Sequence, residues 1–215
     1  MSAAPRVEAS RGIPVADGIR LATDIYRPAS DASVPVVLLR TPYDRKAHLH
    51  EALAWCRHGI ACVVQDVRGR YDSDGAFIPY HHERSDGAAT VDWLTEQEWA
   101  AGIVAYGGSY AAFTAWAVAA ERPTAVSRVI SVVPAMGLER VKFDPSGVLR
   151  LDDHTGWWVG TAMPAPAATD GTKCSWQVSP TYSTPCPSPT WRIGCNCLAG
   201  SRSSTTAPGC DLLAP

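Results

Sequence analysis

The sequence predicts an α/β fold built around a parallel sheet. Two observations lead to this prediction. Short apolar runs without polar alternation are typical of strands buried on both faces of a sheet, and they alternate along the chain with segments of helical pattern. The chain has 215 residues, of which 46% are hydrophobic and 19% charged. This length suits one domain better than two.

The first half of the chain supplies three predicted strands and one helix. Residues 18–28 alternate apolar and polar side chains, as a half-buried strand does. Residues 36–39 and 60–64 are apolar throughout, so we expect central strands there. Between these two strands, residues 50–57 have a helical pattern, and Gly59 is placed to end the helix.

The second half continues the alternation. A helix is expected to begin at Ser85 or Asp86, because either side chain can cap its first turn. Residues 103–106 then predict a strand, and residues 110–120 predict a helix that is apolar nearly all round and therefore buried. Residues 128–133 predict one more strand.

A glycine-rich turn joins the last of these helices to the strand before it, with the sequence Gly107-Gly108-Ser109-Tyr110-Ala111. A serine on such a sharp turn is held in a strained conformation, with its hydroxyl above the sheet edge. Gly107 and Ala111 are small enough to let strand and helix pass closely. The helix start also brings the Tyr110 N–H and a positive dipole end near a developing oxyanion. The context favours Ser109 as a nucleophile, and a serine that merely caps the helix is the alternative.

Four segments together resemble one family of serine hydrolases: Asp17 to Pro28, Arg40 to Asp44, Gln65 to Gly75, and Gly107 to Tyr110. In order and spacing they are similar to parts of the Xaa-Pro dipeptidyl-peptidase and cocaine-esterase family. These parts are its opening strand, its oxyanion loop, its Asp-x-Arg-Gly…Ser-x-Gly signature and its nucleophile elbow. The resemblance covers roughly residues 12–160. It implies an α/β-hydrolase core that cleaves an ester or amide (peptide) bond through an acyl-enzyme.

The resemblance also implies roles for individual residues. Ser109 is expected to be the acylated nucleophile, and the Tyr43 hydroxyl and the Tyr110 N–H are expected to form the oxyanion hole. A neutral phenol beside the elbow can stabilise a developing alkoxide. Without the family match, Tyr43 reads as an ordinary loop tyrosine. We further expect Asp66 and Arg68 to form an ion pair that holds their loop.

The remaining members of a Ser-Asp-His triad are not found in this chain. In this fold the acid and the histidine follow the serine along the sequence, and the histidine must accept the serine proton. Only His154 follows Ser109, and its segment resembles the family's entry into the cap rather than its triad loop. We therefore expect an incomplete α/β-hydrolase core. The alternative is a truncated, catalytically inactive remnant. The strand at 128–133 then lacks outer neighbours, which predicts poor solubility.

The composition changes near residue 164. Residues 1–163 are expected to form the N-terminal part of an α/β-hydrolase domain. Residues 164–215 are expected to form an irregular low-complexity tail rich in Pro, Ser, Thr and Cys. Translation out of the family's reading frame and a truncated paralogue are two open origins for this tail. It holds five of the seven cysteines, Cys174, Cys186, Cys195, Cys197 and Cys210. Since no Cys-x-x-Cys pair is among them, we predict no metal site.

Charge and hydropathy limit the partners. A net charge of −2 and a pI of about 6.3 give no reason to expect nucleic acid or an anionic membrane. Residues 1–12 lack the pattern of a signal peptide, and polar residues interrupt the apolar stretch at 103–120, so no membrane span is expected. We therefore expect a cytoplasmic protein that acts on a small-molecule ester or peptide without a cofactor. The oligomeric state is left open.

Overall fold

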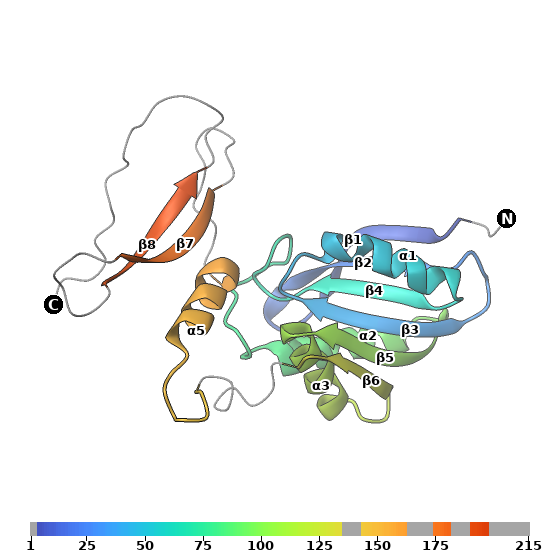
Figure 1. Ribbon diagram of the computed structural model, residues 1–215. Coiled ribbons are helices and arrows are strands. Elements are labelled where there is room, and N and C mark those ends of the chain that lie inside the picture. Colours follow the sequence, from blue (N-terminus) through green and yellow to red (C-terminus); the bar gives the residue numbers. More distant parts are fainter. Residues whose placement is uncertain (1–3, 135–142, 163–173, 182–189, 198–215) are drawn as a thin grey trace. The chain divides into compact units, whose positions relative to one another are not determined.

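The alternating strands and helices fold into a six-stranded sheet with the strand order β1-β2-β4-β3-β5-β6 (Figure 1). This arrangement is seen in a computed structural model, which describes residues 4–134, 143–162, 174–181 and 190–197. The strands are β1 (Arg6–Pro14), β2 (Arg20–Arg27), β3 (Val34–Thr41), β4 (Ala61–Asp66), β5 (Ala100–Gly108) and β6 (Val126–Val132). The predicted strands are all present.

The sheet is mixed rather than wholly parallel. Neighbouring strands among β3, β4, β5 and β6 pair in parallel, whereas β2 pairs antiparallel with both β1 and β4. The edge strand β1 was not predicted, because seven of its nine residues are exposed and its sequence mixes charged residues with small and apolar ones. Its ladder with β2 is irregular between Glu8 and Arg11. The pairing with β2, rather than a pattern of its own, makes this segment a strand.

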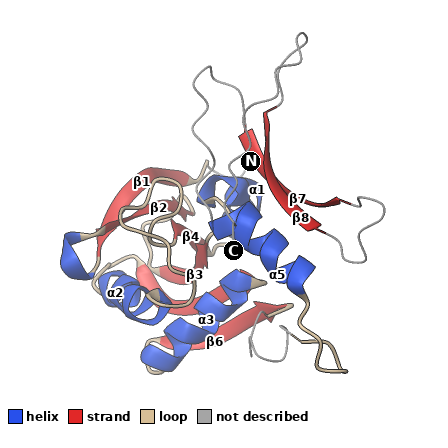
Figure 2. Ribbon diagram, turned by 90° about the vertical axis from the view of Figure 1, so that its left-hand side faces the viewer, coloured by secondary structure: helices blue, strands red, loops and turns tan. Residues whose placement is uncertain are grey.

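Helices cover both faces of the six-stranded sheet, so this part of the chain has three layers (Figures 1 and 2). These helices are α1 (Leu49–Arg57), α2 (Glu83–Thr95) and α3 (Tyr110–Glu121). Helices α2 and α3 pack on the face that carries Val36 and Leu38. Helix α1 packs on the other face, against Val37 and Leu39. The alternation of one strand's side chains between two cores follows from the pleat.

Helix α2 begins earlier than the sequence predicts. Its first residue is Glu83, and His82 occupies the cap position without a side-chain cap bond. The hydroxyl of Ser85 instead donates to the His82 carbonyl at 3.1 Å. Asp86 is buried and bound to Arg68. Both expected capping residues therefore lie inside the first turn of the helix, and their side chains bind other groups.

The chain divides into two compact units, Met1–Val141 and Lys142–Pro215. The second unit contains α5 (Leu151–Trp157), η3 (Trp158–Ala162) and a hairpin-like pair of antiparallel strands, β7 (Cys174–Thr181) and β8 (Thr190–Cys197). The composition of the tail did not indicate these two strands. A two-stranded sheet alone is at most marginally stable in water. The boundary at 163/164 stays a prediction.

In the part of the chain that the structure describes, no helix has both the length and the apolar character needed to cross a bilayer.

Candidate active site

Ser109 lies on a sharp turn between β5 and α3. Its backbone has φ 54° and ψ −120°, in a region that residues other than glycine rarely adopt. Its N–H donates to the Val132 carbonyl of β6 at 3.0 Å, and its carbonyl accepts from the Ala112 N–H at 3.1 Å. These two bonds fix the turn, and the Ser109 residue is exposed. The strained strand-to-helix turn is therefore present where the sequence predicts it.

Gly107 has no room for a side chain. A Cβ atom there would lie 2.2 Å from the carbonyl oxygen of Ala111, far inside van der Waals contact. Gly108 is different, because the nearest atom to its Cβ would be the Val132 oxygen at 3.8 Å. The close approach of strand and helix thus demands glycine at position 107, as the sequence indicated, and does not demand it at position 108.

Tyr43 reaches Ser109 from the loop after β3. The Tyr43 hydroxyl lies 3.4 Å from the Ser109 Oγ. Two bonds hold the Tyr43 loop: the Tyr43 N–H donates to the Thr41 hydroxyl at 3.0 Å, and Arg70 donates from Nε to the Pro42 carbonyl at 3.1 Å. The structure therefore brings together two residues that are 66 positions apart in the sequence.

Tyr110 is the first residue of α3 and is fully buried. Its hydroxyl donates to the Glu83 Oε1 at 2.9 Å and accepts from the Tyr80 N–H at 2.7 Å. Burial, together with the neighbouring Glu83 carboxylate, raises the pKa of the Tyr110 hydroxyl well above its ordinary value. The phenol stays neutral, so its role is to hold neighbours. The backbone N–H of Tyr110 lies in the first turn of the helix, where N–H groups have no acceptor inside the helix.

A buried ion pair lies next to Tyr110 and was missed in the sequence. Arg40 Nη1 lies 3.2 Å from the Glu83 Oε2 and donates to the Glu83 carbonyl at 2.8 Å. The side chains of Arg40 and Glu83 are 1% and 4% exposed. Burial raises the pKa of the Glu83 carboxyl above its ordinary value. The only sequence signal was a charged residue directly after the apolar run of β3, which marks Arg40 as a buried charge in need of a partner.

The predicted ion pair between Asp66 and Arg68 is wrong. Asp66 binds Arg45, whose N–H and Nη1 donate to the two carboxylate oxygens at 2.7 and 2.5 Å. Arg68 binds Asp86 of α2 through two bonds of 2.9 and 2.6 Å. Asp66 ends β4 and Arg68 lies in the loop beyond it, so the two side chains meet different elements. The Arg68–Asp86 pair holds the loop after β4 to α2, whereas the Arg45–Asp66 pair joins the end of β4 to the loop after β3.

Arg45 is the centre of a further buried cluster. Its guanidinium is fully buried and also binds Asp24 at 3.0 Å, Asp72 at 2.8 Å and the Ser10 hydroxyl at 2.7 Å. These partners come from β1, β2 and the loop after β4. One cation therefore ties together the loop after β3 and three other segments.

The other candidate residues of the sequence belong to the second unit of the chain. His154 lies in α5, within the second unit, so its predicted lack of a triad role stays a prediction. Two tail cysteines, Cys174 and Cys197, face each other in the register of β7 and β8. Cys186 and Cys210 lie outside the described residues. Among the described residues, no group of three or more His, Cys, Asp or Glu side chains is placed to hold a metal ion.

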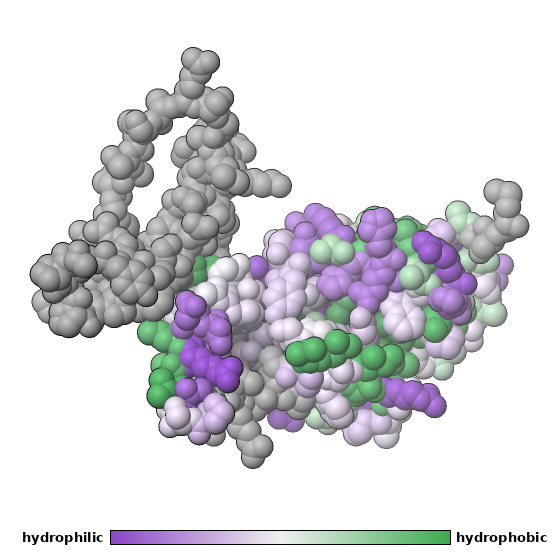
Figure 3. Space-filling view, in the orientation of Figure 1, coloured by the Kyte–Doolittle hydropathy of each residue, from purple (hydrophilic) through white to green (hydrophobic). Residues whose placement is uncertain are grey.

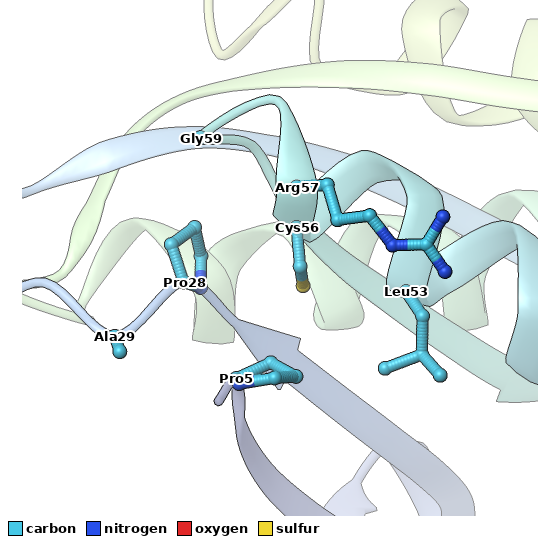
Figure 4. Close-up of a pocket in the computed structure, with 7 residues that line it drawn as sticks. All are labelled: Pro5, Pro28, Ala29, Leu53, Cys56, Arg57 and Gly59. Atoms are coloured by element: carbon cyan, nitrogen blue, oxygen red, sulfur yellow. The ribbon is translucent and has the colours of Figure 1, made fainter. Parts of the chain in front are cut away.

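The structure has a pocket of about 440 Å³, and Figure 4 shows the side chains that line it. Pro5, Pro28, Leu53, Cys56 and Arg57 are among the residues that line it. It lies where β2 ends and β4 begins, since Tyr26 pairs with Cys62 there. Ser109 follows the carboxyl end of β5, which runs parallel to β3 and so in the same direction as β4. The pocket is therefore at the opposite end of the sheet.

The fold and the turn together define a class of protein. A serine on a strained strand-to-helix turn at the carboxyl edge of the sheet, with the Tyr43 hydroxyl from the loop after β3 beside it, has the geometry typical of an α/β-hydrolase. The chain also matches the family model of the X-Pro dipeptidyl-peptidases (S15 family) over residues 17–180. It belongs to this family.

A curated relative supports this assignment, and two solved structures of lower identity share the fold. The chain is 34% identical over 165 residues to a cocaine esterase of Rhodococcus sp. (strain MB1 Bresler), a match that covers 70% of this chain and 28% of that protein. The chain thus spans little more than a quarter of that relative's length. The structure of an α-amino acid ester hydrolase is similar, with a TM-score of 0.62 and 20% identity over 76% of this chain and 32% of that one. The structure of an aminopeptidase from a Thaumarchaeota archaeon is also similar. Its TM-score is 0.60 and its identity 22%, and the match covers 82% of this chain and 32% of that one.

Proposed function

We propose that this chain carries the nucleophile of a serine hydrolase that cleaves an ester or amide bond in a small-molecule or peptide substrate. The observation that supports this most directly is the 3.4 Å approach of the Tyr43 hydroxyl to the Ser109 Oγ on a strained elbow. This chain is similar to a cocaine esterase and to an α-amino acid ester hydrolase. Esters are therefore the first class of substrate to test.

The proposed reaction has two halves. The Ser109 Oγ attacks the carbonyl carbon and gives up its proton to a base, and the carbonyl oxygen becomes an oxyanion. The Tyr43 O–H and the Tyr110 N–H donate hydrogen bonds to this oxyanion. The leaving alcohol or amine then takes the proton from this base, and water hydrolyses the acyl-Ser109 ester, which releases the acid and restores the Ser109 hydroxyl. The base and its carboxylate partner are not assigned to residues of this chain.

Covalent labelling by a fluorophosphonate tests the nucleophile. We expect the folded protein to be labelled at Ser109 and the Ser109→Ala variant not to be labelled, with Ser85→Ala as a control at an exposed serine. Loss of one oxyanion donor lowers rates by about 10²–10³-fold, so Tyr43→Phe should slow labelling by a factor in that range. A folded wild-type protein that takes no label contradicts the proposal.

The second candidate is a catalytically inactive remnant, which the sequence leaves open. It predicts cooperative unfolding together with no labelling. Resequencing the gene from codon 150 and translating all three frames addresses its origin. A frame that continues the family pattern with an Asp and a later His supports a complete hydrolase and rejects the remnant.

A further inference from the structure

The hydroxyl of Tyr110 joins three segments in the wall of the candidate site. It is bonded to the carboxylate of Glu83, at the start of α2, and to the backbone N–H of Tyr80 in the loop before that helix. The Tyr80 ring also lies 4.6 Å from the Tyr110 ring and 4.8 Å from the Phe113 ring. These contacts fix the side chain of Tyr110, and therefore the first turn of α3, against α2.

Arg40 extends the same network toward the other proposed oxyanion donor. It lies near the end of β3, three residues before Tyr43. Its guanidinium binds Glu83, and its carbonyl accepts from the Thr114 hydroxyl of α3 at 2.8 Å. One connected network of buried groups thus joins the strand that leads to Tyr43 with the helix that begins at Tyr110.

The buried Arg40–Glu83 ion pair is not an efficient way to stabilise the fold. Among the described residues, Arg40 Nη2 is buried without a hydrogen bond, and the buried Glu83 Oε2 has the ion-pair contact with Arg40 Nη1 but no hydrogen bond. A buried ion pair that leaves polar atoms unsatisfied is often less stable than a packed apolar pair of the same volume. Gly87 leaves room for this pair and for a neighbouring side chain, since a Cβ there would meet the Val118 Cγ2 first and then the Arg40 Nη1 at 2.9 Å. Stability alone therefore does not account for these charges.

We propose that Glu83, oriented by Arg40, is a positioning residue that fixes the Tyr110 N–H relative to the Tyr43 hydroxyl. This inference rests on the proposed function, because it assigns a role to the two oxyanion donors of Ser109. Glu83 acts through Tyr110 and does not touch the reacting atoms. Donors that are held in place before the reaction stabilise a developing charge without reorganisation. A misplacement of about 1 Å costs up to roughly 100-fold in rate.

The test uses phenylboronic acid, which adds to a serine hydroxyl and mimics the tetrahedral oxyanion. The Ser109 Oγ–B bond forms, the Oγ proton goes to solvent, and boron gains the negative charge. Because affinity is an equilibrium quantity, it can be measured by ¹¹B NMR without an assigned catalytic base. The measurement is made on the full chain, with urea unfolding of each variant to establish that it is folded.

We expect Tyr110→Phe, which removes only the hydroxyl, and Glu83→Ala each to weaken boronate binding about tenfold. The double variant should bind no more weakly than either single one, since both remove the same link. Glu83→Gln keeps an oxygen acceptor for the Tyr110 hydroxyl and should restore most of the affinity. The matched control is Asp86→Asn, a buried carboxylate of the same helix that binds Arg68. It should lower stability and leave the affinity unchanged.

The outcomes separate this inference from the proposed function. If the wild-type protein forms no boronate adduct, or Ser109→Ala binds as well as the wild type, the proposed nucleophile is wrong and the inference falls with it. If binding depends on Ser109 but Tyr110→Phe and Glu83→Ala bind like the wild type, only the positioning role is overturned. A loss of affinity in Asp86→Asn equal to that in Glu83→Ala also overturns it, because affinity then merely follows stability.

Discussion

Strands β4 and β6 are both rich in valine and both lie in the parallel part of the sheet, but their surroundings differ. All six residues of β4 are buried, whereas Val126 is the only buried residue of the seven in β6. Strand β4 lies between β2 and β3. Among the described strands, β6 has β5 as its one neighbour and forms the edge of the sheet (Figure 1).

The difference separates strand formation from burial. Both segments form strands because branched apolar side chains favour extended backbone. Burial, in contrast, comes from neighbours on both edges and faces. In β6 and just after it, Ile130, Val132 and Val133 are 39%, 47% and 81% exposed. Figure 3 shows the resulting apolar surface over the region where Figure 1 places β6. An apolar sequence thus predicts a strand, but it does not show that the described part of the chain buries that strand.

The largest effect should come from placing the same charge in each strand. Val63 of β4 is fully buried, so Val63→Asp buries a carboxylate without a partner and should cost more than about 4 kcal/mol of unfolding free energy. Ile130→Asp in β6 should change it by less than about 0.5 kcal/mol. Urea unfolding followed by circular dichroism measures both. Similar losses at the two positions contradict the comparison.

The next effect compares two arginine ion pairs in the same way. Arg68→Met leaves the buried Asp86 carboxylate without its cation and should lower the unfolding free energy by about 3–5 kcal/mol. Arg122 forms a similar pair with Asp92 on the surface, at 2.6 Å. Exposed pairs contribute little because water and salt screen them, so Arg122→Met should leave the urea midpoint unchanged. A measurable loss there rejects burial as the deciding variable.

Local pattern was enough to predict most of the fold. Strands β2 to β6 and helices α1 to α3 follow from apolar runs, periodicity and turn residues that lie within a few positions of each other. The elbow at Ser109 was predictable for the same reason. The partners of the charges were not: Asp66 pairs with Arg45 and Arg68 with Asp86, across 21 and 18 positions. Which charged residues pair depends on how helices, strands and loops pack together, and a short stretch of sequence does not reveal this packing.

The candidate site shows the same limit. The closeness of Tyr43 to Ser109 was expected from the family resemblance and not from spacing. The roles of Glu83 and Arg40 were not expected at all, since the contact of Glu83 with Tyr110 forms only when α2 packs beside the elbow. The edge strand β1 was missed because its partner β2, and not its own sequence, makes it a strand.

A smaller loss of unfolding free energy is expected for a substitution in β5, which lies between β3 and the edge strand β6. Gly107→Ala would place a Cβ 2.2 Å from the Ala111 oxygen and should cost about 1–3 kcal/mol or more through forced backbone movement. Gly108→Ala meets nothing closer than 3.8 Å and should be tolerated. Thermal unfolding of the two variants tests this. Equal melting temperatures show that strand and helix can move apart at the elbow.

The smallest expected effect is a change in the association of the chain through its edge strands, β1 and β6. Strand β1 is also an edge, but it carries Arg6, Glu8 and Arg11 and an irregular ladder, which are features that oppose pairing with another chain. Strand β6 carries Arg128 as its one charge, beside exposed valine and isoleucine. We therefore expect the chain to associate as its concentration rises, in light scattering or sedimentation, and Ile130→Lys to reduce the association. The matched variant Val7→Lys in β1 should have no effect, because that edge is already protected. A wild-type chain that stays monomeric and melts cooperatively at every concentration shows that β6 needs no cover.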